Sequence, residues 1–308
     1  MARAVQIWPP YRLGMSIPTQ RPGIVVGVDG SPASMVAVDW AARDAAMRNV
    51  SLTLVHVASG LAGTWPQMPT SIGVGTWQRR RGGEIFDRAV RIVDQATQGT
   101  GSIQIETEMY YSSTIPTLID MSKDAEMVVV GSRGHSAFGS LLGSVSAGLI
   151  QHAHCAVAVI HDEDPLMLHP AQAPVLVGID GSPTSELATA IAFDEASRRH
   201  VDLLALHAWS DARLADFPGV DWPTLESSEH EVLAERLAGW QERYSDVTVH
   251  RYIVCDRPAR QLVERSEAAQ LVVVGSHGRG GFAGMLLGSV SSAVVQSARM
   301  PVIVARQP

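Results

Sequence analysis

Lysine and cysteine are both scarce in this sequence. Its 308 residues include 24 lysines and arginines together, and Lys123 is the only lysine. A phosphate loop of the G-x-x-x-x-G-K-[ST] type needs a lysine beside its last glycine, and Lys123 lies in no such motif, so that class of site is excluded. Two cysteines, Cys155 and Cys255, are too few for the disulfide framework of a small secreted domain. We therefore predict a cytoplasmic protein.

Long apolar runs and an excess of basic charge are also missing. No stretch approaches about 18 uninterrupted apolar residues, which excludes an ordinary transmembrane helix. The 24 basic residues are outnumbered by 31 acidic ones, and the net charge of −7 argues against broad binding to nucleic acid or anionic membrane. Residues 1–22 contain no continuous apolar segment, so we expect an extension rather than a signal peptide. We predict no nucleic-acid partner and no membrane partner.

The chain repeats itself. GVDGSP, beginning at Gly27, recurs 151 residues later as GIDGSP at Gly178, and VVVGSRG around Gly131 recurs as VVVGSHG around Gly275. A chain of this length corresponds to about two domains. The junction is a proline-rich stretch over 162–174, where regular structure is discouraged. The predicted organisation is an N-terminal extension (1–22), a first domain (23–165) and a second domain (172–308).

Each half alternates short apolar runs with amphipathic stretches, which predicts strands alternating with helices. The first half is expected to begin with a strand over 24–29, a helix to about residue 48 and a strand over 51–57, with a later helix over 77–98. Apolar strands separated by helices form a parallel sheet covered on both faces. The fold class is therefore α/β, with two tandem doubly wound parallel sheets. Their apolar last strands, VAVI and VIVA, would leave open edges, so we expect the two halves to pair.

In an open sheet of this kind, ligands bind beyond the carboxyl ends of the strands. The first candidate loop is Asp29-Gly30-Ser31-Pro32, repeated as Asp180-Gly181-Ser182-Pro183. The aspartate can accept hydrogen bonds from a ligand, and the glycine permits close approach of the backbone. An alternative stays open, in which the aspartate and serine only cap the following helix.

The second candidate loop is rich in glycine. Gly275-Ser276-His277-Gly278 is followed after nine residues by Gly288-Ser289, and Val290 and Ser291 open an apolar helix. Converging backbone N–H groups and a helix N-terminus form a cradle for an anion, and the serine hydroxyls can donate to phosphate oxygens. In the first half, eight residues separate Gly134 from Gly143, so the loop there is one residue shorter. The alternative is a glycine-rich linker with a serine cap.

This spaced glycine motif, together with a strand-ending aspartate, resembles the ATP-binding universal stress protein family. The duplication over 23–306 resembles the tandem members of mycobacteria and other actinobacteria. The resemblance implies the adenine nucleotide alpha hydrolase-like fold, with five strands in the order 3-2-1-4-5 in each half and ATP lying across strands one and four. With the loops described above, the predicted ATP-binding residues of the first half are Asp29, Gly30, Val57, Gly131, Arg133, Gly134, Gly143, Ser144, Val145 and Ser146. Those of the second half are Asp180, Gly181, Ala208, Gly275, His277, Gly278, Gly288, Ser289, Val290 and Ser291.

The resemblance further implies a nucleotide-dependent sensor or regulator of the stress response, with ATP and Mg²⁺ as ligands. No general base or carboxylate pair lies in the glycine loops, so we predict no catalytic residues and at most slow hydrolysis. His152, His154 and Cys155 lack a fourth ligand at suitable spacing, so no protein-bound metal is predicted. Expected partners are a second copy of the chain, or the other half in a pseudo-dimer, and a regulatory protein. Two alternatives remain: an ATPase or ATP-pyrophosphatase-like transferase, and an interaction module with vestigial pockets.

Overall fold

The computed structural model describes residues 23–58, 72–99, 103–134, 142–162, 170–208, 222–279 and 287–307. The expected extension over 1–22 lies outside these residues, as does much of the expected junction.

The two halves contain the same elements in the same order. The strands are β1 (Ile24–Gly27), β2 (Leu52–Ala58), β3 (Ile105–Tyr111), β4 (Met127–Gly131), β5 (Ala156–Ile160), β6 (Val175–Gly178), β7 (Leu203–Ala208), β8 (Val249–Val254), β9 (Leu271–Gly275) and β10 (Val302–Ala305). The helices are α1 (Pro32–Arg48), α2 (Ile72–Ala96), α3 (Thr114–Met121), α4 (Ser144–His152), α5 (Pro183–Arg199), α6 (Trp222–Arg243), α7 (Pro258–Ser266) and α8 (Ser289–Ser297), with a short 3-10 turn η1 (Pro170–Gln172).

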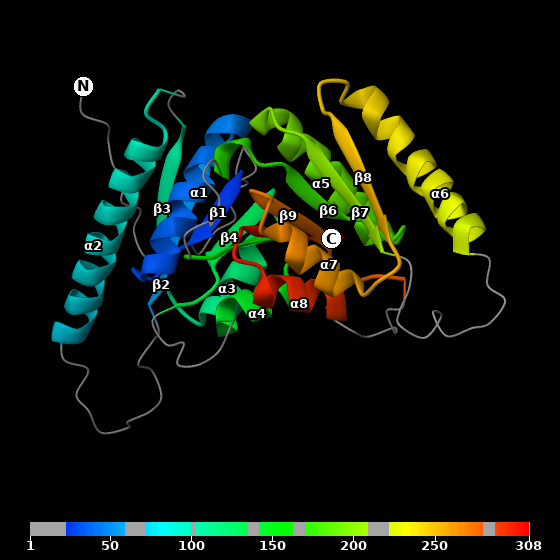
Figure 1. Ribbon diagram of the computed structural model, residues 1–308. Coiled ribbons are helices and arrows are strands. Elements are labelled where there is room, and N and C mark those ends of the chain that lie inside the picture. The colour runs from blue at the N-terminus through cyan, green and yellow to red at the C-terminus, as the bar shows by residue number, and fades with distance from the viewer. Residues whose placement is uncertain are drawn as a thin grey trace.

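All ten strands form one sheet in the order β3-β2-β1-β4-β5-β10-β9-β6-β7-β8. Each half therefore has the predicted order 3-2-1-4-5, and its strands are parallel. The halves join where β5 and β10 pair antiparallel, with Ala158 opposite Ile303. The expected pairing of the two apolar last strands is confirmed. The result is one continuous sheet, with β3 and β8 at its outer edges (Figure 1).

Two apolar layers cover the sheet. One cluster unites strand residues such as Val26 and Val177 with α1, α2, α5 and α6, and it includes the fully buried Phe193. The other unites Val128 and Val272 with α3, α4, α7 and α8. Figure 1 shows α2 and α6 at the two outer ends of the molecule and the shorter helices together on one side. The inner strands are thus buried between helices, as their continuous apolar sequences predict, whereas the outer strands β3 and β8 are partly exposed.

The helices α1 and α5 begin and end with equivalent capping residues. Each helix has a serine N-cap whose hydroxyl accepts from the backbone N–H three residues later, and a proline in its first turn. Each ends at a residue in the left-handed conformation, Asn49 or His200. Asparagine is enriched at such positions, whereas His200 gives little sequence signal.

The start of α2 differs from the expectation. The sequence favoured a loop to residue 75 and a helix over 77–98, but α2 spans Ile72–Ala96. Gly73 and Gly75 suggested a loop, and each glycine costs a helix only about 1 kcal/mol. In a helix of 25 residues, that cost is outweighed by the packed face containing Ala89 and Val93.

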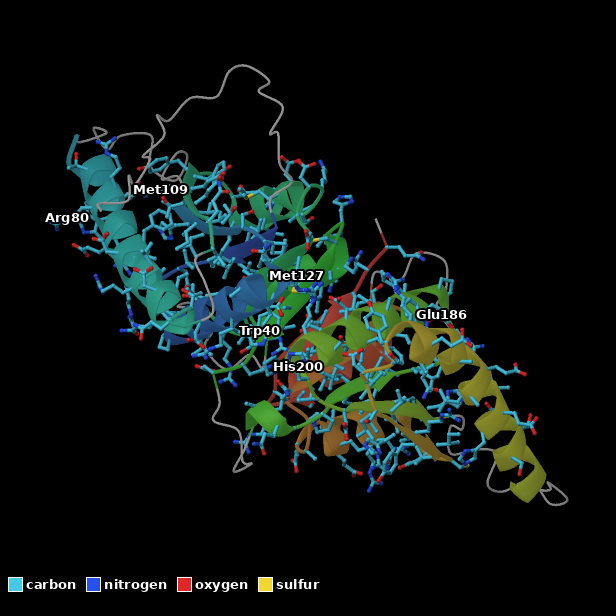
Figure 2. All side chains as sticks on the ribbon, turned by 90° about the horizontal axis from the view of Figure 1, so that it is seen from above. Trp40, Arg80, Met109, Met127, Glu186 and His200 are labelled. Atoms are coloured by element: carbon cyan, nitrogen blue, oxygen red, sulfur yellow. The ribbon has the colours of Figure 1, made fainter. Side chains whose placement is uncertain are left out.

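A buried group of charges links the halves where α1 meets α5. Asp44 and Glu195 are fully buried, and Arg48 contacts both, at 2.8 Å from Asp44. Arg199, 151 residues after Arg48, bonds in the same way to Glu195 at 2.8 Å and to Asp44 at 3.1 Å. Its guanidinium also lies 5.5 Å from the ring centre of Trp40, which Figure 2 shows close to His200 in the middle of the molecule. Each arginine therefore neutralises one acid of its own half and one of the other.

Burial and the neighbouring Glu195 carboxylate raise the pKa of Asp44 to about 7, against the lowering effect of Arg48 and Arg199. The two arginines are thus required to hold two buried carboxylates.

Two further side chains cross the joint at equivalent positions. Arg306, after β10, donates to the carbonyls of Ile150 and Ala153 at the end of α4. His161 stands 145 residues earlier, after β5, and its two ring nitrogens lie 3.1 Å from the carbonyls of Met300 and Val295, the latter in the last turn of α8. Carbonyl oxygens only accept, so a ring nitrogen that bonds to one of them must donate its proton.

We expect Arg48→Met to lower the free energy of unfolding by about 3–5 kcal/mol, because it leaves buried carboxylates without a partner. Urea unfolding followed by circular dichroism measures this. The matched control is Arg43→Met on the same helix, where Arg43 pairs with Asp39 and its side chain is 60% exposed. The control is expected to change stability by less than about 1 kcal/mol. Equal effects of the two substitutions would contradict the role of the buried group.

We expect His161→Leu to cost about 1–3 kcal/mol, since it leaves buried carbonyls unsatisfied. His161→Arg should recover most of this loss, because arginine performs the equivalent task at position 306. Chemical denaturation of both variants, with exposed His154→Leu as the control, makes the comparison. If the leucine and arginine variants are equally stable, the cross-joint bonds do not matter.

Candidate functional site

The two predicted loops of each half meet at the carboxyl edge of the sheet. β1 pairs with β4 and β6 with β9, so the loops that follow these strands are neighbours. A Cβ added to Gly131 would lie 2.8 Å from the backbone carbon of Ala33, and one on Gly275 would lie 2.8 Å from that of Thr184. The first turns of α1 and α5 therefore rest directly on the ends of β4 and β9. Only glycine permits this approach.

The aspartate loops have the geometry of helix caps in both halves. Asp29 and Asp180 each accept, through Oδ1, the backbone N–H two residues later at 2.9 Å. The intervening glycines, Gly30 and Gly181, have φ values of 86° and 78°, in the region that favours glycine. The capping alternative is thus observed in the structure, and it leaves the carboxylate at the edge of the sheet, where both aspartates are half-buried.

The second carboxylate oxygen of each aspartate faces the glycine loop. A Cβ on Gly134 would lie 2.7 Å from Asp29 Oδ2, and one on Gly278 would lie 2.6 Å from Asp180 Oδ2. In the second half, the backbone N–H of Arg279 donates to Asp180 Oδ2 at 3.1 Å. The aspartate therefore fixes the start of the glycine loop, and a side chain at the second glycine of the motif would displace the aspartate carboxylate.

The helices that follow the glycine loops begin without a capping side chain. Gly143 and Gly288 are the N-caps of α4 and α8, and their own N–H groups donate to the carbonyls of Ser132 and Ser276 at 2.7 Å. Closure of the loop is thus the same in both halves, although residues 135–141 and 280–286 lie outside the described part of the chain. The first-turn N–H groups of these helices have no intrahelical acceptor. With the helix dipole, they favour an anion.

The predicted serines divide into two kinds. Ser144 and Ser289, at the first helical position, are exposed at the edge of the sheet. Ser146 and Ser291 are buried, and their hydroxyls donate to the carbonyls of the first glycines: Ser146 to Gly131 at 3.2 Å and Ser291 to Gly275 at 2.5 Å. The buried pair ties each helix to its strand, whereas the exposed pair is accessible to solvent. Val145 and Val290 between them are half-buried.

His277 and its counterpart Arg133 are held differently. The carbonyl of His277 accepts from the Thr184 hydroxyl at 2.6 Å, and its Nδ1 lies 3.0 Å from Ser276 Oγ. Ala33 stands where Thr184 stands in the second half, so this anchor is specific to one copy. Sequence reasoning missed Thr184, and only the comparison of the two copies pointed to a difference at that position.

Val57 and Ala208 lie at the ends of β2 and β7, half-buried, at the same edge as the loops. Beside Ala208, the imidazole of His207 lies 2.6 Å from the Ile179 carbonyl and 3.0 Å from Glu229 of α6, so α6 forms a wall of the second site. The structure thus brings the predicted residues of each half to one edge. Among the side chains it describes, no three His, Cys, Asp or Glu groups are placed to hold a metal ion.

Fold and edge geometry define a tandem α/β sheet with a glycine-rich loop at the edge of each half, and comparison with known proteins gives the family. The universal stress protein family profile matches residues 22–161 and 173–306, so the chain belongs to that family. Universal stress protein Rv2623 of Mycobacterium tuberculosis is 59% identical over 286 residues, covering 92% of this chain and 96% of that protein. Universal stress protein Rv2005c of the same organism is 55% identical over 294 residues, covering 95% and 100%.

Among solved structures, a universal stress protein from Archaeoglobus fulgidus matches 94% of this chain and 100% of its own, with a TM-score of 0.69 and 21% identity. At that identity, the match shows the tandem fold alone.

We expect Gly275→Ala to destabilise the protein by about 1–3 kcal/mol, because the new methyl group meets the backbone of α5 at 2.8 Å. Gly239→Ala in α6 is the control, since a Cβ there meets nothing within 4 Å. It should stabilise by roughly 0.5–1 kcal/mol, as alanine favours helices. Urea midpoints of the two variants should therefore move in opposite directions, and a neutral Gly275→Ala would show that the strand end and helix are not in tight contact.

Proposed function

We propose that this protein binds ATP with Mg²⁺ in its two sheet-edge sites and acts as a nucleotide-dependent sensor or regulator of a stress response. The observation that carries the proposal is the cradle itself. In each half, an uncapped helix N-terminus, glycines without room for a side chain and a strand-ending aspartate lie at one edge. The chain's only lysine, Lys123, lies in the turn after α3, so no lysine serves these sites, and the backbone N–H groups of the cradle supply donors for phosphate.

Binding rather than turnover is the proposed activity. The aspartate of the second half already accepts two backbone N–H groups, so it is engaged as a structural acceptor rather than poised as a base. Slow hydrolysis at most is expected from such a site. The rival function, an interaction module with vestigial pockets, predicts no nucleotide binding and is decided by the same experiment.

The proposed setting is the cytoplasm, with a regulatory protein partner and a homodimer as the assembly. In the described part of the chain no helix is long and apolar enough to cross a membrane. Since β5 and β10 are paired within the chain, β3 and β8 are the open edges of the sheet, where a second copy would approach.

We expect purified wild-type protein to carry or bind adenine nucleotide, and the double variant Gly143→Glu, Gly288→Glu to lose it. Each new carboxylate would stand at the helix N-terminus that the phosphates need. Mass spectrometry of released nucleotide and isothermal titration with ATP and Mg²⁺ measure this. The matched control is Gly239→Glu, which adds the same charge in open space on α6.

Each single variant should remove one of two binding equivalents. A wild-type protein that neither carries nor binds adenine nucleotide would refute the proposal. Loss of binding in the Gly239→Glu control would attribute the effect to net charge instead of the cradle.

A further inference from the structure

An arginine outside the predicted motifs lies against the second aspartate loop. The guanidinium of Arg236, from α6, is so close to Gly181 that a Cβ there would lie 2.2 Å from Cζ and Nη1 and 2.3 Å from Nη2. Three nearly equal distances mean that the planar group lies with its face against the glycine. Gly181 also has a positive φ, so this position favours glycine for two separate reasons.

The guanidinium is held in place by one weak ion pair. Nη1 donates to Glu186 Oε1 at 3.0 Å, from the first turn of α5, and the two side chains are 29% and 44% exposed. Figure 2 shows Glu186 at the side of α5 that faces α6. An exposed pair of this kind contributes only about 0–1 kcal/mol. Within the described chain, Nη1 alone has a hydrogen-bond partner, so the other guanidinium N–H donors remain available.

A continuous set of contacts runs from Arg236 to the helix N-terminus of the cradle. Arg236 touches Gly181, and the adjacent Asp180 touches Gly278. Beyond Gly278, a Cβ on Gly288 would lie 3.4 Å from Cα of His277. The arginine therefore lies beside the aspartate loop that contacts the glycine loop, and the N-terminus of α8 follows that glycine loop. The arginine supplies a full positive charge to this edge, and the helix supplies a partial one.

The first half has no counterpart of Glu186. Met35 stands 151 residues before Glu186, and it is buried in the core, so the carboxylate that holds Arg236 is specific to the second half. Within the first glycine loop, Arg133 stands where the second half has His277. The charged side chains at the two edges therefore differ.

We propose that Arg236 is a phosphate-contacting residue of the second site, which exchanges Glu186 for phosphate oxygens of the bound nucleotide. The proposal rests on ATP binding at this edge. Guanidinium and phosphate form strong, charge-assisted and often bidentate hydrogen bonds, whereas the pair with Glu186 is exposed and weak. Glu186 therefore holds Arg236 in position through a pair that breaks easily. Glu186 also competes with the phosphate oxygens for the guanidinium.

The test uses the full chain with Gly143→Glu, so that only the second site reports. In this background, Arg236→Gln should weaken ATP binding about 10- to 100-fold, as loss of a hydrogen bond to a charged group does, and leave adenosine binding unchanged. Glu186→Gln should strengthen ATP binding several-fold, because the competing carboxylate is removed. Arg243→Gln is the matched control on the same helix, where the guanidinium lies 5.9 Å from the ring centre of Trp240. Isothermal titration with ATP and with adenosine gives the affinities of the parent and of each variant, and Arg236→Lys should retain part of the binding that Arg236→Gln loses.

Three outcomes overturn the proposal. If Arg236→Gln binds ATP as tightly as its parent, the arginine makes no contact with the ligand. If ATP and adenosine weaken equally, Arg236 only shapes the aspartate loop. If the parent variant binds no ATP while the wild type does so only through the first half, the second site is not a nucleotide site at all. Failure of the wild type to bind is a different result, which refutes the proposed function itself.

Discussion

Antiparallel pairing of β5 with β10 is the contact on which the arrangement of the whole molecule depends. Each half has one apolar last strand that would otherwise be an open edge, and pairing the two satisfies their backbone groups in a single ten-stranded sheet. Because strands are parallel within each half and antiparallel at the joint, the carboxyl ends of the two halves point in opposite directions. The two candidate sites therefore lie at opposite edges of the sheet, and each must be complete within its own half.

The joint is reinforced by side chains that each half sends to the other. Arg48 and Arg199 share two buried acids across the joint between α1 and α5, and Arg306 and His161 reach the carbonyl ends of the opposite helices. Buried charges contribute stability only when they are fully paired. The main effect of these contacts is therefore to specify one way of joining the halves, and their contribution to the free energy of unfolding is secondary. The use of arginine at one position and histidine at its equivalent shows that the two halves have diverged while keeping the same geometry.

Function in this fold depends on where side chains are absent. Gly131 and Gly275 let a helix rest on a strand end, and Gly134 and Gly278 let an aspartate reach the next loop. The groups left to face a ligand are backbone N–H donors, which carry no net charge and cannot be recognised from composition. A single lysine far from the glycine loops is consistent with such a site, and the added cations come from arginines that differ between the halves.

The sequence by itself determined the repeated α/β order, the parallel strands and the candidate loops. These features depend on local signals, which are the apolar periodicity, the repeated GxDGSP segment and the spacing of the glycines. Such signals act through local sterics and hydrogen bonding. It also predicted that the two halves would pair through their apolar last strands, although it did not fix that this pairing would be antiparallel. The sequence did not predict that α2 begins at Ile72, because Gly73 and Gly75 suggested a loop. The packing that stabilises this helix forms only in the folded chain.

Only the tertiary structure decided which side chains hold the loops in place. Ser291 and Ser289 are alike in sequence, yet one is buried against Gly275 and the other is exposed. Arg236 lies more than fifty residues from Gly181 along the chain, and no periodicity places the two in contact. Such pairings depend on the angle at which a long helix packs on the sheet, which is set by the sum of many apolar contacts and not by any local pattern.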